Sequence, residues 1–208
     1  MTIRLNGSTS GYTQLDSPAV GGNNTLFLPA GNGTANQILR NGATAGSLEF
    51  TDKIVSGTAV ASTSGTSIDF TGIPSWVKRV TVMLNGVSTN GGSLTLLRLG
   101  AGSITSSGYS SASGYSGPGN QAGGVTNSTG FVYGQNAAAS TYSGHIVITN
   151  FSGNTWICSV MLGRIDDGFD FGGGGNVTLS GTLDRVRITT ANGTDTFDAG
   201  SINILYEG

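Results

Sequence analysis

Charge and cysteine are both scarce in this chain of 208 residues. Charged residues make up 10% of the sequence, against about 25% in typical soluble domains, and the net charge at pH 7 is -2. Such a chain offers no electrostatic footprint for nucleic acid or for an anionic membrane surface. The single cysteine, Cys158, can form no intrachain disulfide. We therefore expect no nucleic-acid partner and a fold held without covalent cross-links.

Long apolar runs are missing as well. No stretch approaches the roughly 18 consecutive apolar residues of a membrane span. The first residues, MTIRLNGSTSGY, lack the apolar centre of a secretory signal. We expect a chain that is made in a cytoplasm, keeps its thiol reduced and does not insert into a membrane.

Glycine is abundant instead, at 36 residues, and almost no segment has the periodicity of a helix. Short segments alternate apolar and polar residues, which is typical of strands with one face in a core. The inward positions that this alternation predicts are Ile68, Phe70, Val80, Val82, Leu84, Val186, Ile188, Ile202 and Ile204. Asn-Gly pairs between such segments favour tight turns. The pattern predicts an all-β fold, with a jelly-roll-like β-sandwich over residues 56–208.

The first 55 residues differ from the rest in composition and in their weak apolar alternation. Residues 26–50, LFLPAGNGTANQILRNGATAGSLEF, dilute a handful of large apolar side chains with Gly, Ala, Asn and Thr. Fixing each residue costs about 1–2 kcal/mol of backbone entropy, and this stretch cannot bury enough of itself to offset that cost. We interpret residues 1–55 as an extended arm for attachment and trimerisation, ordered by further copies or by a neighbouring protein. The interface candidates are Leu26, Leu28, Ile38, Leu39 and Phe50.

One thiol and one imidazole, Cys158 and His145, are the only combination that resembles a nucleophile and a base. They lie on two neighbouring predicted strands. Pairing Ile146 with Cys158 across a five-residue loop places His145 on the opposite face of the sheet from the thiol. A two-residue turn at Ser152-Gly153 would reverse this, but it would pair the apolar face with His145. We therefore expect a buried, inert Cys158 and no enzymatic activity.

Three carboxylates gather in RIDDGFDFGGGG, at Asp166, Asp167 and Asp170. Calcium prefers oxygen-rich loops, but this spacing does not match the EF-hand pattern. We favour a solvated loop whose carboxylates keep an aggregation-prone edge of the fold soluble. Calcium binding by this loop is left open. No pair of carboxylates stands in a context typical of a glycosidase. We expect no cofactor and assign no residue as a metal ligand.

Residues 100–144 form a Gly/Ser-rich stretch, interpreted as an insertion, that also carries tyrosines. Between Arg98 and Arg164 the chain has no Asp, Glu, Lys or Arg. Aromatic faces with nearby amides and hydroxyls can hold neutral sugars by stacking and hydrogen bonding. The contact candidates are Tyr109, Tyr115, Tyr133 and Tyr142. The alternative is that these rings cover the end of the sandwich or pack between subunits.

Three segments of the chain resemble proteins of tailed bacteriophages. Residues 26–50 resemble the N-terminal segments of fibre and other virion-appendage proteins, in which an LP-x-G-x-G-x-A-N-Q-x-L stretch recurs. Residues 73–91, IPSWVKRVTVMLNGVSTNG, and 181–207, GTLDRVRITTANGTDTFDAGSINILYE, are similar to a domain common in phage and prophage tail proteins. The resemblance implies a structural, non-enzymatic and usually trimeric component.

From this resemblance we expect a virion structural protein of the tail-fibre type, made in the host cytoplasm. Residues 1–55 would attach to the particle, and residues 56–208 would present the β-sandwich for host-surface contact. The expected partners are the chain itself as a homotrimer, another virion protein of the baseplate, tail or capsid, and a host surface glycan. A capsid decoration or head-fibre protein, anchored on the phage shell, is the alternative.

Overall fold

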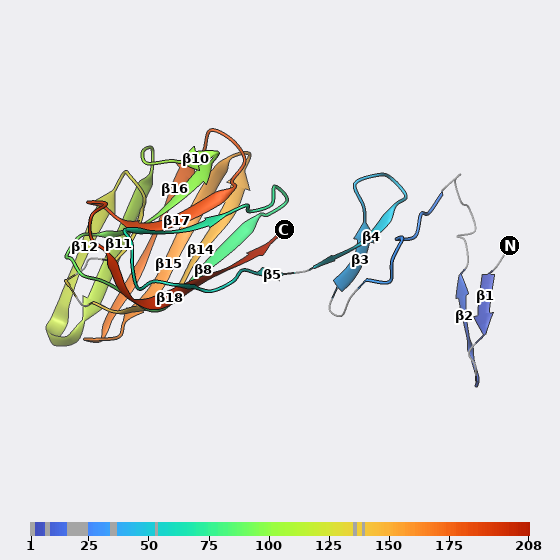
Figure 1. The fold of residues 1–208 in the computed structure, drawn as a ribbon, viewed down its shortest axis with the longest axis horizontal. Coiled ribbons are helices and arrows are strands. Elements are labelled where there is room, and N and C mark those ends of the chain that lie inside the picture. Colours follow the sequence, from blue (N-terminus) through green and yellow to red (C-terminus); the bar gives the residue numbers. More distant parts are fainter. Residues whose placement is uncertain are drawn as a thin grey trace. The chain divides into compact units, whose positions relative to one another are not determined.

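The computed structural model describes residues 3–6, 9–15, 25–33, 37–52, 54–134, 137–138 and 140–208. Figure 1 shows its two units, residues 1–53 and 54–208, which we describe separately. The division falls two residues before the predicted one, because Val55 and Ser56 already pair with a strand of the second unit. Over the described residues the chain is nearly all β, with antiparallel sheets and no α-helix, so the predicted all-β class is confirmed.

The first unit contains two antiparallel hairpins. They are formed by β1 (Ile3–Asn6) with β2 (Tyr12–Leu15), and by β3 (Gln37–Asn41) with β4 (Leu48–Asp52). Phe27 extends the second hairpin through a parallel bridge to Ser47, and the backbone N–H of Leu48 donates to the Phe27 carbonyl at 2.9 Å. Gly46 has a φ of 81°, and a Cβ atom there would collide with the Thr25 carbonyl, so the turn requires glycine.

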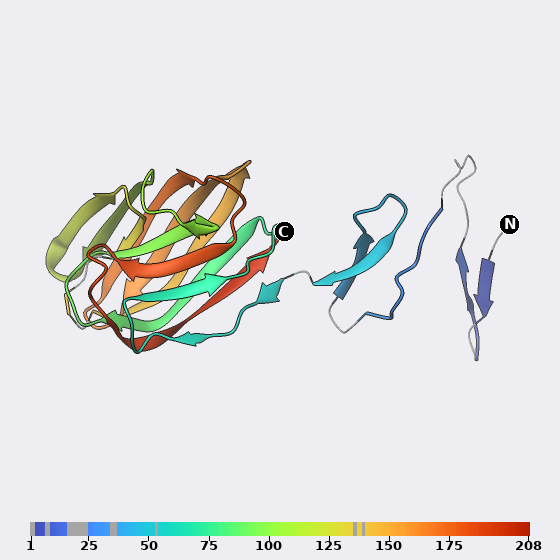
Figure 2. The ribbon, with the colours of Figure 1, turned by 45° about the horizontal axis from the view of Figure 1, so that its top comes forward.

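The second unit consists of two antiparallel sheets, which Figure 2 shows as two layers. The larger has the order β12 (Gln121–Asn127), β11 (Ser110–Gly117), β16 (Phe169–Thr178), β15 (Thr155–Arg164), β14 (Tyr142–Ser152), β8 (Arg79–Thr89), β18 (Phe197–Glu207) and β5 (Val55–Ser56), with β6 (Val60–Ala61) also on β18. The smaller has the order β10 (Ser103–Ile104), β9 (Thr95–Ala101), β17 (Arg185–Thr190) and β7 (Ser67–Thr71), with β13 (Phe131–Gly134) also on β9.

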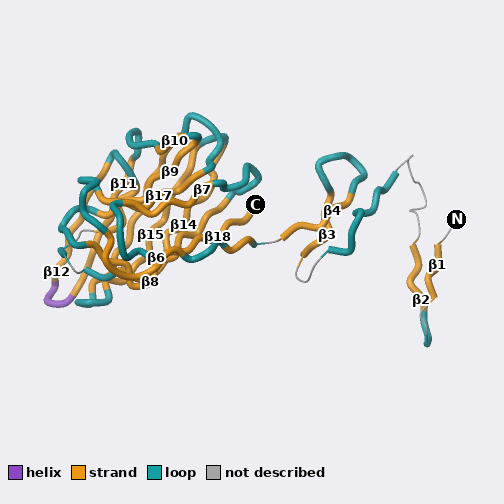
Figure 3. The backbone as a smooth tube through the Cα atoms, in the orientation of Figure 1, coloured by secondary structure: helices purple, strands orange, loops and turns teal. Residues whose placement is uncertain are grey.

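A single apolar core fills the space between the two layers. All nine predicted inward residues are buried, and they join one cluster that draws on both sheets. Their alternation is confirmed because each strand turns one face to the opposite sheet and the other to solvent. The arrangement is sandwich-like, and Figure 3 shows the strands joined by loops at both ends of the layers.

Residues 100–144 belong to the two sheets. They contribute β10, β11, β12 and β13 and the start of β14, and one short 3-10 turn (η1, Pro118–Asn120) joins β11 to β12. We expected an insertion because Ser, Gly and Ala dominate here. These strands form through backbone ladders that require no large side chain, such as the seven-residue pairing of β11 with β16.

The β14–β15 hairpin differs in register from the prediction. Ile146 pairs with Val160 instead of Cys158, and the turn has two residues, because Ser152 pairs with Thr155. Such a turn alone would reverse the inward face. A register shift between Asn150 and Ser152 compensates for this reversal. The observed pairing is therefore displaced by two residues from the predicted one, and a displacement of two leaves every side chain on its predicted face of the sheet.

Cys158 is 5% exposed, and burial raises the pKa of its thiol. We predict that Cys158→Ser lowers the free energy of unfolding by about 1–3 kcal/mol, because it places a hydroxyl on an apolar face. Cys158→Ala and Cys158→Val should have smaller effects. Urea denaturation of the three variants measures the order. Rapid labelling of the native thiol would contradict the burial.

Candidate functional site

The thiol and the imidazole point to opposite sides of the larger sheet. Cys158 is buried in the core, whereas His145 is exposed on the outer face, opposite Met83 and Met161 on the neighbouring strands. The expectation that they form no pair is confirmed. The thiol therefore cannot act with this histidine.

The carboxylates of residues 166–170 are divided between two environments. Arg164 forms ion pairs with Asp166 at 3.2 Å and with Asp167 at 2.8 Å, while Asp170 lies on β16. Partial burial opposes the charge of Asp166, but hydrogen bonds from the Thr141 N–H and from Arg164 outweigh it and lower its pKa. In the described part of the chain no group of three or more His, Cys, Asp or Glu residues is placed to hold a metal ion.

The four candidate tyrosines form part of the packing. Tyr109, Tyr133 and Tyr142 are buried, at 4%, 0% and 1% exposure, and Tyr115 packs against the core from the side. The interpretation of the three buried rings as a stacking surface is therefore corrected. The alternative, that the rings cover the end of the sandwich, agrees with their burial.

Contacts with other aromatic rings account for the burial of Tyr109 and Tyr142. Tyr142 packs edge-on against Phe171 at a centroid distance of 5.4 Å, and Tyr109 packs edge-on against Phe131 at 5.0 Å. The Tyr109 hydroxyl also accepts a hydrogen bond from the Leu99 N–H at 2.8 Å. Desolvation of the phenol outweighs that bond and raises the pKa of Tyr109 to about 12. These rings fill the end of the core nearest β11 and β13.

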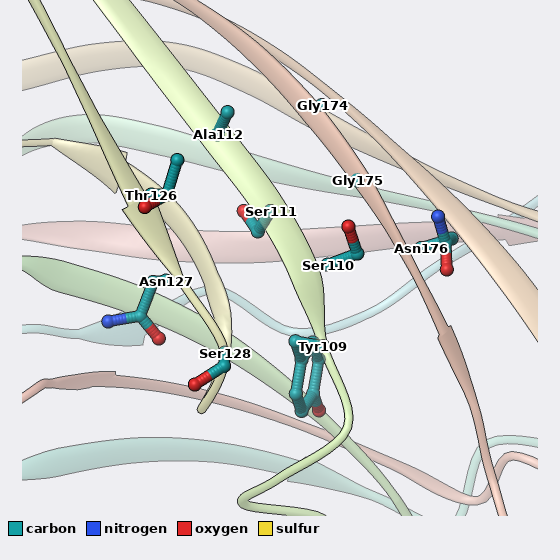
Figure 4. Close-up of a pocket in the computed structure, with 10 residues that line it drawn as sticks. All are labelled: Tyr109, Ser110, Ser111, Ala112, Thr126, Asn127, Ser128, Gly174, Gly175 and Asn176. Carbon is teal, nitrogen blue, oxygen red and sulfur yellow. The ribbon is translucent and has the colours of Figure 1, made fainter.

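An open pocket of about 520 Å³ lies on the outer face of β11, β12 and β16 (Figure 4). Its lining is free of ionisable groups except for Tyr109, which is directed into the core. The lining residues are Tyr109, Ser110, Ser111, Ala112, Thr126, Asn127, Ser128, Gly174, Gly175 and Asn176. No sequence pattern predicted this pocket, although the charge-free run between Arg98 and Arg164 was a signal for it.

The floor of this pocket is shallow because small residues face one another across the strands. Ala112 on β11 lies opposite Gly174 on β16 and Thr126 on β12. The next outward row pairs Gly114 with Gly172, and a second hollow of about 430 Å³ opens above it. The outer face is therefore hollowed along the β11–β16 pair.

Large apolar side chains are exposed in the first unit. Leu26, Leu28, Ile38 and Leu39 have 62%, 75%, 46% and 50% of their surface exposed, and Phe50 is half-buried. No described side chain between residues 25 and 51 is buried. This apolar surface of the arm, defined by Leu26, Leu28, Ile38, Leu39 and Phe50, contains the predicted interface candidates.

Alkaline titration tests the burial of Tyr109. A buried phenol resists ionisation, so the stability that Tyr109 contributes is complete below its ordinary pKa of about 10 and is lost as pH rises through its folded pKa of about 12. We predict that Tyr109→Phe leaves the phenolate absorbance gained near pH 10 unchanged in the folded protein. The same titration in concentrated urea is the control, because every phenol then ionises near pH 10. A loss of absorbance in folded Tyr109→Phe would show that Tyr109 is exposed.

In the described residues, no helix has the length and apolarity that a membrane crossing requires. Comparison of the chain with protein-family models, with curated protein sequences and with solved structures finds no match. The function has to be argued from the residues and surfaces described above.

Proposed function

We propose that the protein is a structural component of a bacteriophage particle, anchored by its first unit and presenting its second. The observation that carries the proposal is the apolar surface of the arm. The resemblance of residues 26–50 to phage virion appendages supplies the kind of particle. The charge-free pocket of the second unit is compatible with contact at a host surface.

The arm has too little packing of its own to account for its sequence. Leu28 is 75% exposed and Leu39 is 50% exposed, although full burial of a leucine gains about 1.5–3 kcal/mol. The charged pair beside them is already neutralised, because Arg40 contacts Glu49 at 3.0 Å. An apolar surface beside a paired arginine and glutamate suits burial against another protein surface.

A homotrimer is the arrangement that we propose for this surface. Closed symmetry lets identical apolar patches cover one another, and it leaves no unpaired patch at the end of the assembly. A few leucines in each chain are then sufficient, because three copies contribute to one axis. A jelly-roll-like sandwich follows the arm in this proposal, with its own core and its outer face free for contact.

Deletion of residues 1–53 tests the anchoring role. The second unit has its own core, so we expect the truncated chain to keep its β circular dichroism and a cooperative thermal transition. It should be absent from purified particles, because the arm supplies the attachment. Normal copy number of the truncated chain on particles would contradict the proposal. A cryo-EM map of intact particles distinguishes the tail position from the alternative position on the capsid shell.

Leu39→Asp tests the trimer. A carboxylate in the apolar surface of the arm should reduce assembly of purified full-length protein at micromolar concentration, with little change in β circular dichroism. The matched control is Ile157→Asp, on the outer face of the second unit, where the side chain has 43% exposure. Light scattering measures both masses. A monomeric mass for the unmodified protein would exclude the self-assembled trimer.

A further inference from the structure

The pocket on β11, β12 and β16 is lined by polar side chains whose hydrogen-bonding groups are available to a ligand. Ser110, Thr126, Ser128 and Asn176 are exposed at the pocket, and their side chains form no hydrogen bond within the described residues. Hydroxyl and amide groups both donate and accept hydrogen bonds. Figure 4 shows these side chains arriving from three strands around one opening. A ligand here meets four unused polar groups of mixed donor and acceptor character.

The surroundings of the pocket are neutral. Residues 99–163 contain no Asp, Glu, Lys or Arg, and β16 supplies only Gly174, Gly175 and Asn176 to the lining. An anionic or cationic ligand would lose hydration in this pocket without gaining an opposite charge. An uncharged ligand rich in hydroxyl groups loses less, because the amide and hydroxyl side chains can replace its water. The chemistry of the pocket therefore favours a neutral polyol.

The floor of the pocket gives the ligand its shape. With Ala112 and Gly174 in the middle row, a flat ring can lie close to the strand backbone. The row at Gly172 lies about 7 Å farther along the strands. A Cβ atom at Gly172 would meet nothing within 4 Å, so packing does not require glycine there. The second hollow, whose lining includes the Asp170 carboxylate of β16, provides room for a second ring beside the first.

We propose that this pocket binds a neutral saccharide, with the first ring above Ala112 and Gly174. Hydrogen bonds from Asn176, Thr126 and the neighbouring serines fix the ring. The proposal deepens the host-contact role proposed above and rests on it for the source of the saccharide. The binding itself is a property of the purified chain and can be measured without particles.

The test uses the full-length protein and calorimetric titration with neutral oligosaccharides of glucose, galactose and N-acetylglucosamine. Uronic-acid and sialylated oligosaccharides form the anionic set. We expect at least one neutral oligosaccharide to bind, with its Kd changing less than about twofold between about 0.05 and 0.5 M salt, because screening acts on charges. Ala112→Leu should raise that Kd more than about tenfold by filling the floor. Asn176→Ala should raise it about threefold or more through a lost hydrogen bond.

Two matched variants control for general effects on the sheet. Ala122→Leu places the same side chain on an exposed position of β12 outside the pocket, and Thr149→Ala removes a hydroxyl from the outer face of β14. Both should bind as the unmodified protein does. Failure of every neutral oligosaccharide to bind, preference for the anionic set, or unchanged binding by Ala112→Leu would each overturn the proposal.

Failure of this proposal can be told apart from failure of the proposed function. Particle incorporation depends on the arm, whereas saccharide binding depends on β11, β12 and β16. A chain that joins particles but binds no saccharide contradicts only the pocket. A chain that binds saccharide but never joins particles contradicts only the role in the virion.

Discussion

Burial of apolar side chains between two sheets holds the second unit together, because the sequence offers few other means. The chain has one cysteine, and its ion pairs lie at the surface. The Arg187–Asp69 pair, for example, has 35% and 37% of its side chains exposed, and such pairs contribute about 0–1 kcal/mol. Each fully buried Ile, Leu or Phe contributes about 1.5–3 kcal/mol. With cohesion supplied by the core, the outer faces are free to carry small, uncharged residues.

The four consecutive glycines of β16 lie in two different environments, one on each face of the strand. Gly173 and Gly175 face inward, where a Cβ atom would press on β11 and, at Gly175, on Phe131. Gly172 and Gly174 face outward and form the floors of the two hollows. The inner pair is needed for the close approach of strands and rings. Gly172 has no such steric reason, and it lies beside Gly114 in the second hollow.

The alternating strands could be predicted from the sequence, and the Gly/Ser-rich strands could not. The inward face of β8 could be predicted from Val80, Val82 and Leu84, because these large apolar side chains occupy every second position. In β11, Ser111 and Ser113 face inward and Ser110 and Ser116 face outward, so alternation gives no signal. The burial of Tyr109, Tyr133 and Tyr142 depends on partners more than ten residues away or on other sheets, such as Phe171. The apolar residues of the first unit could be recognised as too sparse for a core, and Leu28 and Leu39 are indeed exposed.

The order of the larger sheet also has a mechanical meaning. Residues 55–61 enter the sheet at β18 through β5 and β6, whereas the pocket lies at the opposite edge, on β11, β12 and β16. In the proposed attachment, a pull between the arm and a ligand in the pocket would cross the sheet at right angles to its strands, through β18, β8, β14 and β15. The ladders along that path are long, with nine residue pairs joining β18 to β8 and ten joining β14 to β15. Such a pull acts along the ladder hydrogen bonds, so the β5 and β6 pairings, with two residue pairs each, would be the first to part.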